Sequence, residues 1–443
     1  YCLMNIEIPA SLLPSDGRFG AGPSRPRASL SKSLGTVGNV IGTSHRQAPV
    51  KTLVHRIREG LAELFTAPAG YEVILGNGGA SLVWDALAFT GVQRRAQAAV
   101  FGEFTRKAAL AVSRAPWIEC STIEAAAGEV ALCDDGMGYA ADSGRLTSSR
   151  RLTDSGYTAN LPGDTALPVE HASDDSFDTY LYAHNETSTG ALSPVWRFGI
   201  CRDGACGRSN AHSPGDAHSR GVSNGQNSRG KGDNNHCDHP LTFVDATSSA
   251  GGVVVDVSET DLYYFSPQKC FGAEGGLWLA LASPAALERF ERLARERYVP
   301  DILNLHLAAV NSRADQTLNT PSIVNLGLIA EQVDWMLDNG GLAGMDASCH
   351  RASGILYAWA EHSEFASPFV SPRWRSPVVA TIDIDETISA KTLRTILRAN
   401  GIVDVDPYRS LGRNQLRVAT FPNVEADDVK ALTACIDYVV ERM

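Results

Sequence analysis

Short, continuously apolar runs alternate with segments of helical periodicity through most of this chain. Leu53, Ile57, Leu61 and Leu64 recur at helical spacing, the run "YEVIL" follows, and "SLVWDALAF" is typical of a helix after the turn "GNGGAS". The runs "AAVF", "YLYAH", "LTFV" and "LYYF" repeat the pattern. Strands that are apolar on both faces and alternate with helices are typical of a parallel sheet covered by helices on both sides. The sequence therefore predicts an α/β fold.

The pattern changes after a helix-like segment that ends at Gly340. Beyond it, "VVATIDID", "SAKTLRTILRANG", "QLRVATF" and "EADDVKALTACIDYVVERM" alternate between strand and helix character. We therefore expect a large domain over residues 1–340 and a small α+β domain over residues 341–443. Residues 203–238 are rich in Gly, Ser and Asn and almost free of apolar side chains, so they are interpreted as a disordered surface insertion in the large domain.

Composition excludes several classes of partner. Of the 443 residues 44% are hydrophobic and 20% charged, as in an ordinary globular protein, and the net charge of −11 argues against nucleic acid or an anionic membrane as the main partner. No apolar run reaches the roughly 20 residues that cross a bilayer. Nine scattered cysteines and a start, "YCLMNIEIPASLLP", without secretory-signal character lead us to expect a cytoplasmic protein. Cysteines and histidines flanking the insertion fit no common zinc spacing, so no metal site is predicted.

Polar residues stand where the apolar runs end. In parallel sheets, ligands collect beyond the carboxyl ends of the strands. Asp245 ends "LTFVD", Lys269 follows "LYYFSPQ", and the Gly76–Ser81 turn opens a helix whose free N–H groups could hold an anion. Pyridoxal phosphate (PLP) needs a lysine for a Schiff base, an acid beside its ring nitrogen and an anion cradle. These three features suit that cofactor, and burial would lower the pKa of the Lys269 amine.

Nine blocks in order carry a family resemblance: "FGAGPSRPR", "GTSHRQAPVKTLV", "YEVILGNGGAS", "AHNETSTG", "VDATSSAGG", "YYFSPQKCF", "GGLWLA", "NTPSI" and "GIVDVDPYRSLGRNQLRVATFP". Together they resemble the phosphoserine aminotransferases, class-V aminotransferases of PLP fold type I, and their actinobacterial-type branch most closely. The resemblance implies a seven-stranded, mostly parallel sheet between helices, followed by a small C-terminal α+β domain. It also implies a homodimer with active sites at the subunit interface.

The implied activity is a PLP-dependent, reversible transfer of an amino group. The enzyme would convert O-phospho-L-serine and 2-oxoglutarate into 3-phosphonooxypyruvate and L-glutamate, a step of L-serine biosynthesis. The alternative is another transaminase of small amino acids, of the alanine–glyoxylate or serine–pyruvate type. A cysteine desulfurase shares the fold but needs a mobile reactive cysteine, for which Cys349 is the only candidate by position.

The resemblance also implies roles for individual residues. Lys269 would form the Schiff base and carry a proton during catalysis, and Asp245 would keep the ring nitrogen protonated. The remaining cofactor contacts would be Phe104 stacking on the ring, Thr187 at its hydroxyl, and Ala80, Ser81, Gln268 and, from the partner subunit, Asn319 and Thr320 at the phosphate.

Substrate recognition would need two anion sites. Arg417 matches the arginine that binds the α-carboxylate, a task suited to a bidentate guanidinium. His45 and Arg46 match the site for the distal phosphate or carboxylate, with Arg409 and Arg413 as supplements from the other subunit. Where this chain has Ala80 and Ser81, other branches carry an arginine.

Each residue also has a purely structural interpretation. Lysines mostly lie on surfaces, and an aspartate after a strand often caps a helix. Phe104 would serve equally as core packing, and His45 with Arg46 as a solvated lead-in to a helix. The apolar runs on both sides of Lys269 favour the cofactor interpretation.

Overall fold

The computed structural model describes residues 6–30, 35, 37–133, 147–150, 176–198 and 239–443. The expected insertion at 203–238 lies outside these residues, as does most of the cysteine and histidine group that flanks it. In the part of the chain that is described, no helix is long and apolar enough to cross a bilayer.

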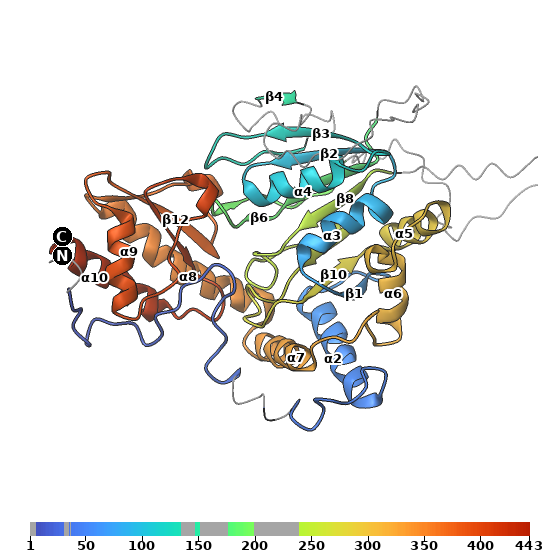
Figure 1. Cartoon of the computed structure of the whole chain (residues 1–443), viewed down its shortest axis with the longest axis horizontal. Helices are drawn as coiled ribbons and strands as arrows, with labels where there is room; N and C mark the ends of the chain where they lie inside the picture. The colour runs from blue at the N-terminus through green and yellow to red at the C-terminus, as the bar shows by residue number, and fades with distance from the viewer. Residues whose placement is uncertain (1–5, 31–34, 36, 134–146, 151–175, 199–238) are drawn as a thin grey trace, which may run out of the picture.

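An eight-stranded sheet forms the centre of the larger unit (Figure 1). Its strands are β1 (Glu72–Asn77), β2 (Arg95–Val100), β3 (Glu119–Glu124), β4 (Thr147–Arg150), β5 (Thr179–Ala183), β8 (Leu241–Asp245), β9 (Leu262–Phe265) and β10 (Leu277–Ala282). Their spatial order is β1-β10-β9-β8-β5-β2-β3-β4. Strands β9, β8, β5, β2 and β3 are parallel, whereas β10 is antiparallel to both of its neighbours. The expected mostly parallel sheet is confirmed.

The expected count of seven strands is wrong for this sheet. The eighth, β4, pairs antiparallel with β3 at the edge. Its sequence, "TSSR", has no apolar run and lies in a polar stretch, so periodicity gave no signal for it. A strand at a sheet edge needs neighbours on one side only, and hydrogen bonding to β3 is enough to define it.

Helices cover both faces of the sheet because its strands are buried on both. On one face, α2 (Ala48–Leu64) and α7 (Ile323–Asp338) pack against side chains such as Tyr263 and Phe265 of β9. On the other face lie α3 (Ala80–Ala86), a π-helical turn (Leu87–Gly91), α4 (Glu103–Ser113), α5 (Pro284–Glu296) and α6 (Leu305–Arg313). Leu262 and Tyr264 of the same strand pack there. This alternation explains why the runs read as continuously apolar.

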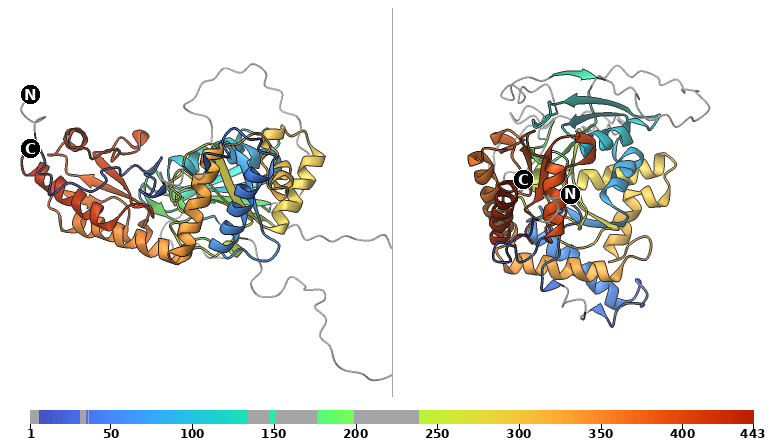
Figure 2. Two further views of the ribbon diagram at one scale, coloured as in Figure 1. Left: turned by 90° about the horizontal axis from the view of Figure 1, so that it is seen from below. Right: turned by 60° about the vertical axis from the view of Figure 1, so that its left-hand side comes forward.

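A smaller C-terminal unit packs at one end of the molecule (Figure 2). Its antiparallel sheet is β11 (Ala366–Pro368), β12 (Val379–Ile384) and β13 (Gln415–Ala419), with helices α8 (Gly341–His362), α9 (Ala390–Ala399) and α10 (Ala426–Val440). Helix α8 reaches from one unit to the other: Met345 packs in the core of the large unit and Leu356 in that of the small one.

The described N-terminal residues run along the C-terminal unit (Figure 1, dark blue). Ile8 and Phe19 pack in its core, and the amide of Phe19 donates to the carbonyl of Val403 at 3.2 Å. The division at Gly340 stays a proposal. The N-terminal segment, which we expected in the large domain, packs with Ile8 and Phe19 in the core of the small unit. A two-stranded ribbon, β6 (Asn185–Glu186) and β7 (Ala191–Leu192), completes the described elements that position the site.

Candidate active site

The carboxyl ends of β2, β5, β8 and β9 meet at one edge of the sheet, since these strands are parallel. Lys269 lies there, in the turn after β9, and is only 8% exposed. Its Nζ donates a hydrogen bond to the carbonyl of Ala21. Burial, helped by the positive charge of Arg417, lowers the pKa of the Lys269 amine to about 8. About a tenth of this amine is therefore neutral and nucleophilic at pH 7.

A segment from the N-terminus covers the lysine. Gly22 has a φ of +141°, and a Cβ at this position would lie 2.2 Å from Nζ of Lys269. The segment is held by Ser24, whose amide donates to the carbonyl of Gln268 at 2.8 Å. It is also held by Arg25, whose Nη1 lies 2.7 Å from Oδ2 of Asp428 in α10. The block "FGAGPSRPR" therefore joins the C-terminal unit to the lysine.

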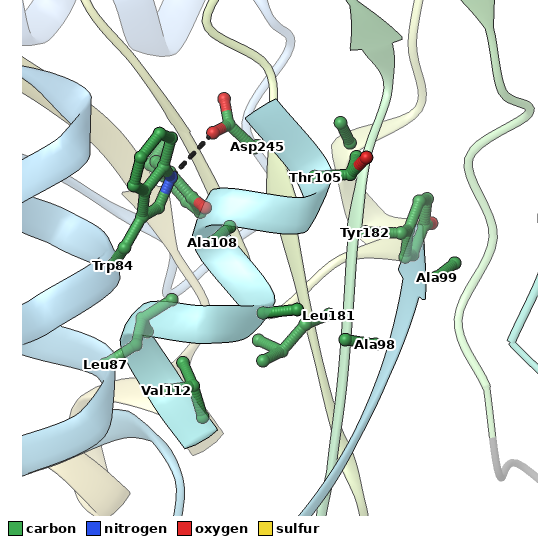
Figure 3. A pocket seen from close by; sticks show the side chains of 13 residues that line it. Trp84, Leu87, Ala98, Ala99, Thr105, Ala108, Val112, Leu181, Tyr182 and Asp245 are labelled. Atoms are coloured by element: carbon green, nitrogen blue, oxygen red, sulfur yellow. Dashed lines mark hydrogen bonds between the residues drawn. The ribbon is translucent and has the colours of Figure 1, made fainter. Parts of the chain in front are cut away.

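Asp245 ends β8 and is 8% exposed. Its Oδ2 accepts from Nε1 of Trp84 at 2.8 Å (Figure 3). Its Oδ1 accepts from the amide of Thr247 at 2.9 Å. Burial raises the pKa of this carboxyl, while these donors and the charge of Lys269 act in the opposite direction. A cation placed beside Asp245 would favour its ionised form, so the site fits a protonated ring nitrogen.

The residues expected at the cofactor phosphate lie around the start of α3. Gly78 adopts a φ of +104° just before the helix, and the amide of Ala80 donates to Oγ of Ser266 at 2.8 Å. Ser81 is exposed in the first turn. Oε1 of Gln268 is buried and has no partner among the described residues. A buried polar atom left open in this way fits a site that waits for a hydrogen-bonding ligand.

Phe104 and Thr187 follow the ends of β2 and β5. The amide of Phe104 donates to Oε1 of Glu186 at 3.3 Å, and the amide of Thr105 donates to Oε2 at 2.8 Å. This fully buried carboxylate thus satisfies the free N–H groups at the start of α4 and sets the position of Phe104. Thr187 is buried and donates to Oγ of Ser248 at 2.8 Å.

Arg417 reaches this edge from β13 of the C-terminal unit. Its Nη1 donates to the carbonyl of Thr187 at 3.2 Å, and its Nε has no partner among the described residues. Its guanidinium lies over Tyr408, whose ring centroid is 5.2 Å from that of Phe104. Burial lowers the pKa of Arg417 from its ordinary value. The structure therefore brings the expected carboxylate-binding arginine beside the expected cofactor residues.

The two residues expected at the second anion site lie in one group with the two expected at the partner subunit's cofactor phosphate. Oγ1 of Thr320 lies 3.1 Å from Nδ1 of His45, Arg46 bonds Gln316 at 2.9 Å, and the amide of Asn319 donates to Asn77 at 3.0 Å. Among the described residues, the hydrogen bonds of these four side chains and amides go to each other or to nearby residues, and none goes to Lys269 or Asp245. All of the four but His45 are exposed. An exposed position suits action on a neighbouring subunit.

Arg409 and Arg413 lie in the loop before β13 and are exposed. Arg413 forms a two-pronged ion pair with Asp383, with Nε 3.0 Å from Oδ1. Cys349, the candidate for a desulfurase, is fully buried in α8 and therefore cannot act as a mobile nucleophile.

Sequence reasoning missed four contributors: Trp84, Glu186, Tyr408 and the Ala21–Gly22 pair. Glu186 lies inside the quoted block "AHNETSTG", and Trp84 lies in the helix predicted after the glycine turn. A search of that helix for side-chain donors would have found Trp84. Tyr408 gave no local signal because its partners come from another unit.

Comparisons with known proteins identify the family of this chain. The family model described as aminotransferase class-V matches residues 232–404. The chain is 45% identical over 441 residues to a relative from Mycolicibacterium vanbaalenii, with 99% of each chain covered. It is 43% identical over 441 residues to the phosphoserine aminotransferase of Nocardioides sp., again with 99% of each covered.

Solved structures show the same fold. The phosphoserine aminotransferase of Cytophaga hutchinsonii superposes with a TM-score of 0.72 at 20% identity, covering 95% of this chain and 99% of that one. The pyridoxamine–pyruvate aminotransferase of Mesorhizobium loti gives a TM-score of 0.72 at 15% identity, covering 99% and 94%. The fold alone thus serves several aminotransferases, whereas the similarity of sequence over the full length is narrower. The chain belongs to the phosphoserine aminotransferase family of class-V aminotransferases.

Proposed function

We propose that this chain is a PLP-dependent transaminase that moves the amino group reversibly between O-phospho-L-serine and 2-oxoglutarate. The products are 3-phosphonooxypyruvate and L-glutamate, a step of L-serine biosynthesis. One observation carries the proposal: three groups meet at the carboxyl edge of the sheet. They are the buried amine of Lys269, the buried carboxylate of Asp245 and the half-buried guanidinium of Arg417. The family membership selects phosphoserine over the alanine–glyoxylate type of substrate.

Bound PLP supplies an electron sink for the charge left when the substrate Cα loses its proton. Lys269 would hold the cofactor covalently through Nζ, because its lowered pKa provides the neutral amine. The same Nζ, once released, would carry the proton to and from Cα. Asp245 would keep the ring nitrogen protonated. The other contacts proposed are Phe104 against the ring, Thr187 at the hydroxyl, and Ala80, Ser81 and Gln268 at the phosphate.

Arg417 would bind the α-carboxylate that both amino acid substrates share. A guanidinium presents a fork of donors that matches a carboxylate, and the open Nε of Arg417 leaves part of this fork available. The hydrogen bond to Thr187 and the ring of Tyr408 hold the side chain in position. The α-carboxylate would thereby be fixed relative to Lys269.

The distal group would be bound across a homodimer interface. His45 and Arg46 would supply its anion site, and Asn319 and Thr320 would reach the cofactor phosphate of the partner subunit. Arg409 and Arg413 would supplement the distal site. The exposure of the arginines and of Asn319 and Thr320 supports action between subunits. We place the reaction in the cytoplasm, where the five described cysteines, all free thiols, would stay reduced.

A coupled assay tests the substrate. The purified protein is supplied with 2-oxoglutarate and either phosphoserine, alanine or serine as the amino donor. We expect kcat/KM for phosphoserine to exceed the other two by orders of magnitude, since only phosphoserine fills both anion sites. Equal values for alanine or serine would overturn the assignment. Sedimentation of the holoenzyme tests the dimer separately, and a monomer would contradict it.

A further inference from the structure

Helix α3 directs an indole at the carboxylate that the proposed function places beside the ring nitrogen. Trp84 lies one turn into α3, and its Nε1 donates to Oδ2 of Asp245 at 2.8 Å. Figure 3 shows the indole and the carboxylate facing one another beside a mostly apolar cavity that both of them line. The cavity is lined by side chains such as Leu87, Val112 and Leu181. The Asp245 carboxylate is therefore the acceptor of this partly buried N–H.

Two elements hold Asp245 from two sides. Trp84 of α3 occupies Oδ2, and the amide of Thr247, in the turn after β8, occupies Oδ1 at 2.9 Å. Each carboxylate oxygen can accept about two hydrogen bonds, so each keeps capacity for a further donor. Both present donors are neutral, so they orient the carboxylate and favour its ionised form without cancelling its charge. Three other titratable side chains interact with this carboxylate: the positive amine of Lys269 and the phenols of Tyr263 and Tyr264.

We propose that Trp84 is a positioning residue: its indole N–H fixes the Asp245 carboxylate in its ionised form and thereby determines how firmly the cofactor ring keeps its proton. This inference rests on the role proposed for Asp245. A buried carboxylate that loses a donor is more easily protonated, and a neutral carboxyl no longer stabilises a pyridinium. Trp84 itself need not touch the cofactor for this effect.

The chain offers a matched control. Nε1 of Trp359, in α8, donates to Oδ1 of Asp437, in α10, at the same distance of 2.8 Å. This pair belongs to the C-terminal unit and contributes no residue to the proposed site. Trp359→Phe therefore removes the same kind of hydrogen bond elsewhere. Trp84→Gln provides a rescue variant, because the amide nitrogen of glutamine is as many bonds from Cα as Nε1 of tryptophan is.

The experiment loads the wild type and the three variants with PLP labelled with ¹⁵N in the ring. The ¹⁵N chemical shift is followed against pH, and the dissociation constant of PLP is measured by absorbance titration. In Trp84→Phe we expect the ring nitrogen to lose its proton at a pH about one unit lower and PLP to bind about tenfold more weakly, the effect of about 1.4 kcal/mol from one hydrogen bond to a charged group. Trp84→Gln should regain most of both values, and Trp359→Phe should match the wild type.

An unchanged titration in Trp84→Phe would overturn the inference. An equal change of the titration in Trp359→Phe would also overturn it. So would a Trp84→Gln variant that restores neither the titration of the ring nitrogen nor the affinity for PLP. A wild-type ring nitrogen that is unprotonated at neutral pH would instead contradict the role of Asp245, and with it the proposed function. If Trp84→Phe does not fold, the inference is tested on the wild type through its indole ¹⁵N–¹H signals. Adding PLP should then shift the signal of Trp84 and leave that of Trp359 unchanged, and an unshifted Trp84 signal would overturn the inference.

Discussion

Replacing Arg417 by glutamine tests the substrate site most directly. Glutamine keeps a donor of similar reach but removes the charge and the fork. Arg417 is half-buried, makes one hydrogen bond to Thr187, and has an open Nε, so an α-carboxylate would be its main ionic partner. Removing one partner of a desolvated charge pair costs about 2–5 kcal/mol. This corresponds to a loss of about 30-fold to about 5,000-fold in kcat/KM.

The structure narrows the expected loss in kcat/KM for Arg417→Gln. Arg417 is only partly buried, so water can offset part of the loss. We therefore expect about 100-fold for Arg417→Gln. Arg417→Lys keeps the charge without the fork and should lose less. Both phosphoserine and glutamate carry an α-carboxylate, so the two half-reactions should fall by the same factor.

The assay is single-turnover absorbance of the bound cofactor with each amino acid in turn. Arg394→Gln serves as control, because Arg394 lies in the same unit and pairs with Asp406 at 3.0 Å. The charge of Arg417 also lowers the pKa of Lys269, so that pKa should rise in Arg417→Gln. Near-wild-type kcat/KM, or a loss confined to one amino acid, would refute the role of Arg417.

Other predictions concern the lysine and the segment that covers it. Lys269→Ala should gain no mass when treated with PLP and borohydride, and a covalent adduct in this variant would contradict the assignment. In the wild type, the rate of PLP capture should rise with pH up to about 8 and then level, as the neutral amine forms, and a flat profile would contradict the lowered pKa. Gly22→Ala should impair PLP capture, because its Cβ would lie 2.2 Å from Nζ, whereas Gly354→Ala, with open space around it, should not. Arg25→Met should destabilise the fold by about 3–5 kcal/mol in denaturant titrations, because it leaves Asp428 buried without its cation.

The same Asp428 gives a pH dependence with a definite sign. Hydrogen bonds from Ser15 and Arg25 outweigh burial and hold the pKa of the Asp428 carboxyl below its ordinary value. Its stabilisation is therefore complete above the ordinary carboxyl pKa and is lost as pH falls through the lower folded value. In Arg25→Met, acid denaturation should begin at a higher pH. An acid midpoint equal to that of the wild type would contradict this contribution.

Local pattern was enough to place Lys269 and Asp245. Each follows a run of apolar residues that is buried on both faces of the sheet, and a parallel sheet aligns such run ends at one edge. The α/β class followed from the same alternation. Strand β4 escaped prediction because its own residues carry no apolar pattern, and among the described residues the strand that it pairs with is β3.

The tertiary structure alone decided which distant residues meet those two. Arg417 lies in a different unit and reaches Thr187 only because β13 packs at the carboxyl edge of the large sheet. Gly22 lies against Lys269 because Arg25 ties the N-terminal segment to α10. Trp84 meets Asp245 through the orientation of α3. Periodicity reports which face of an element is buried, whereas contacts between units depend on how whole elements pack, and no local pattern in the chain encodes that.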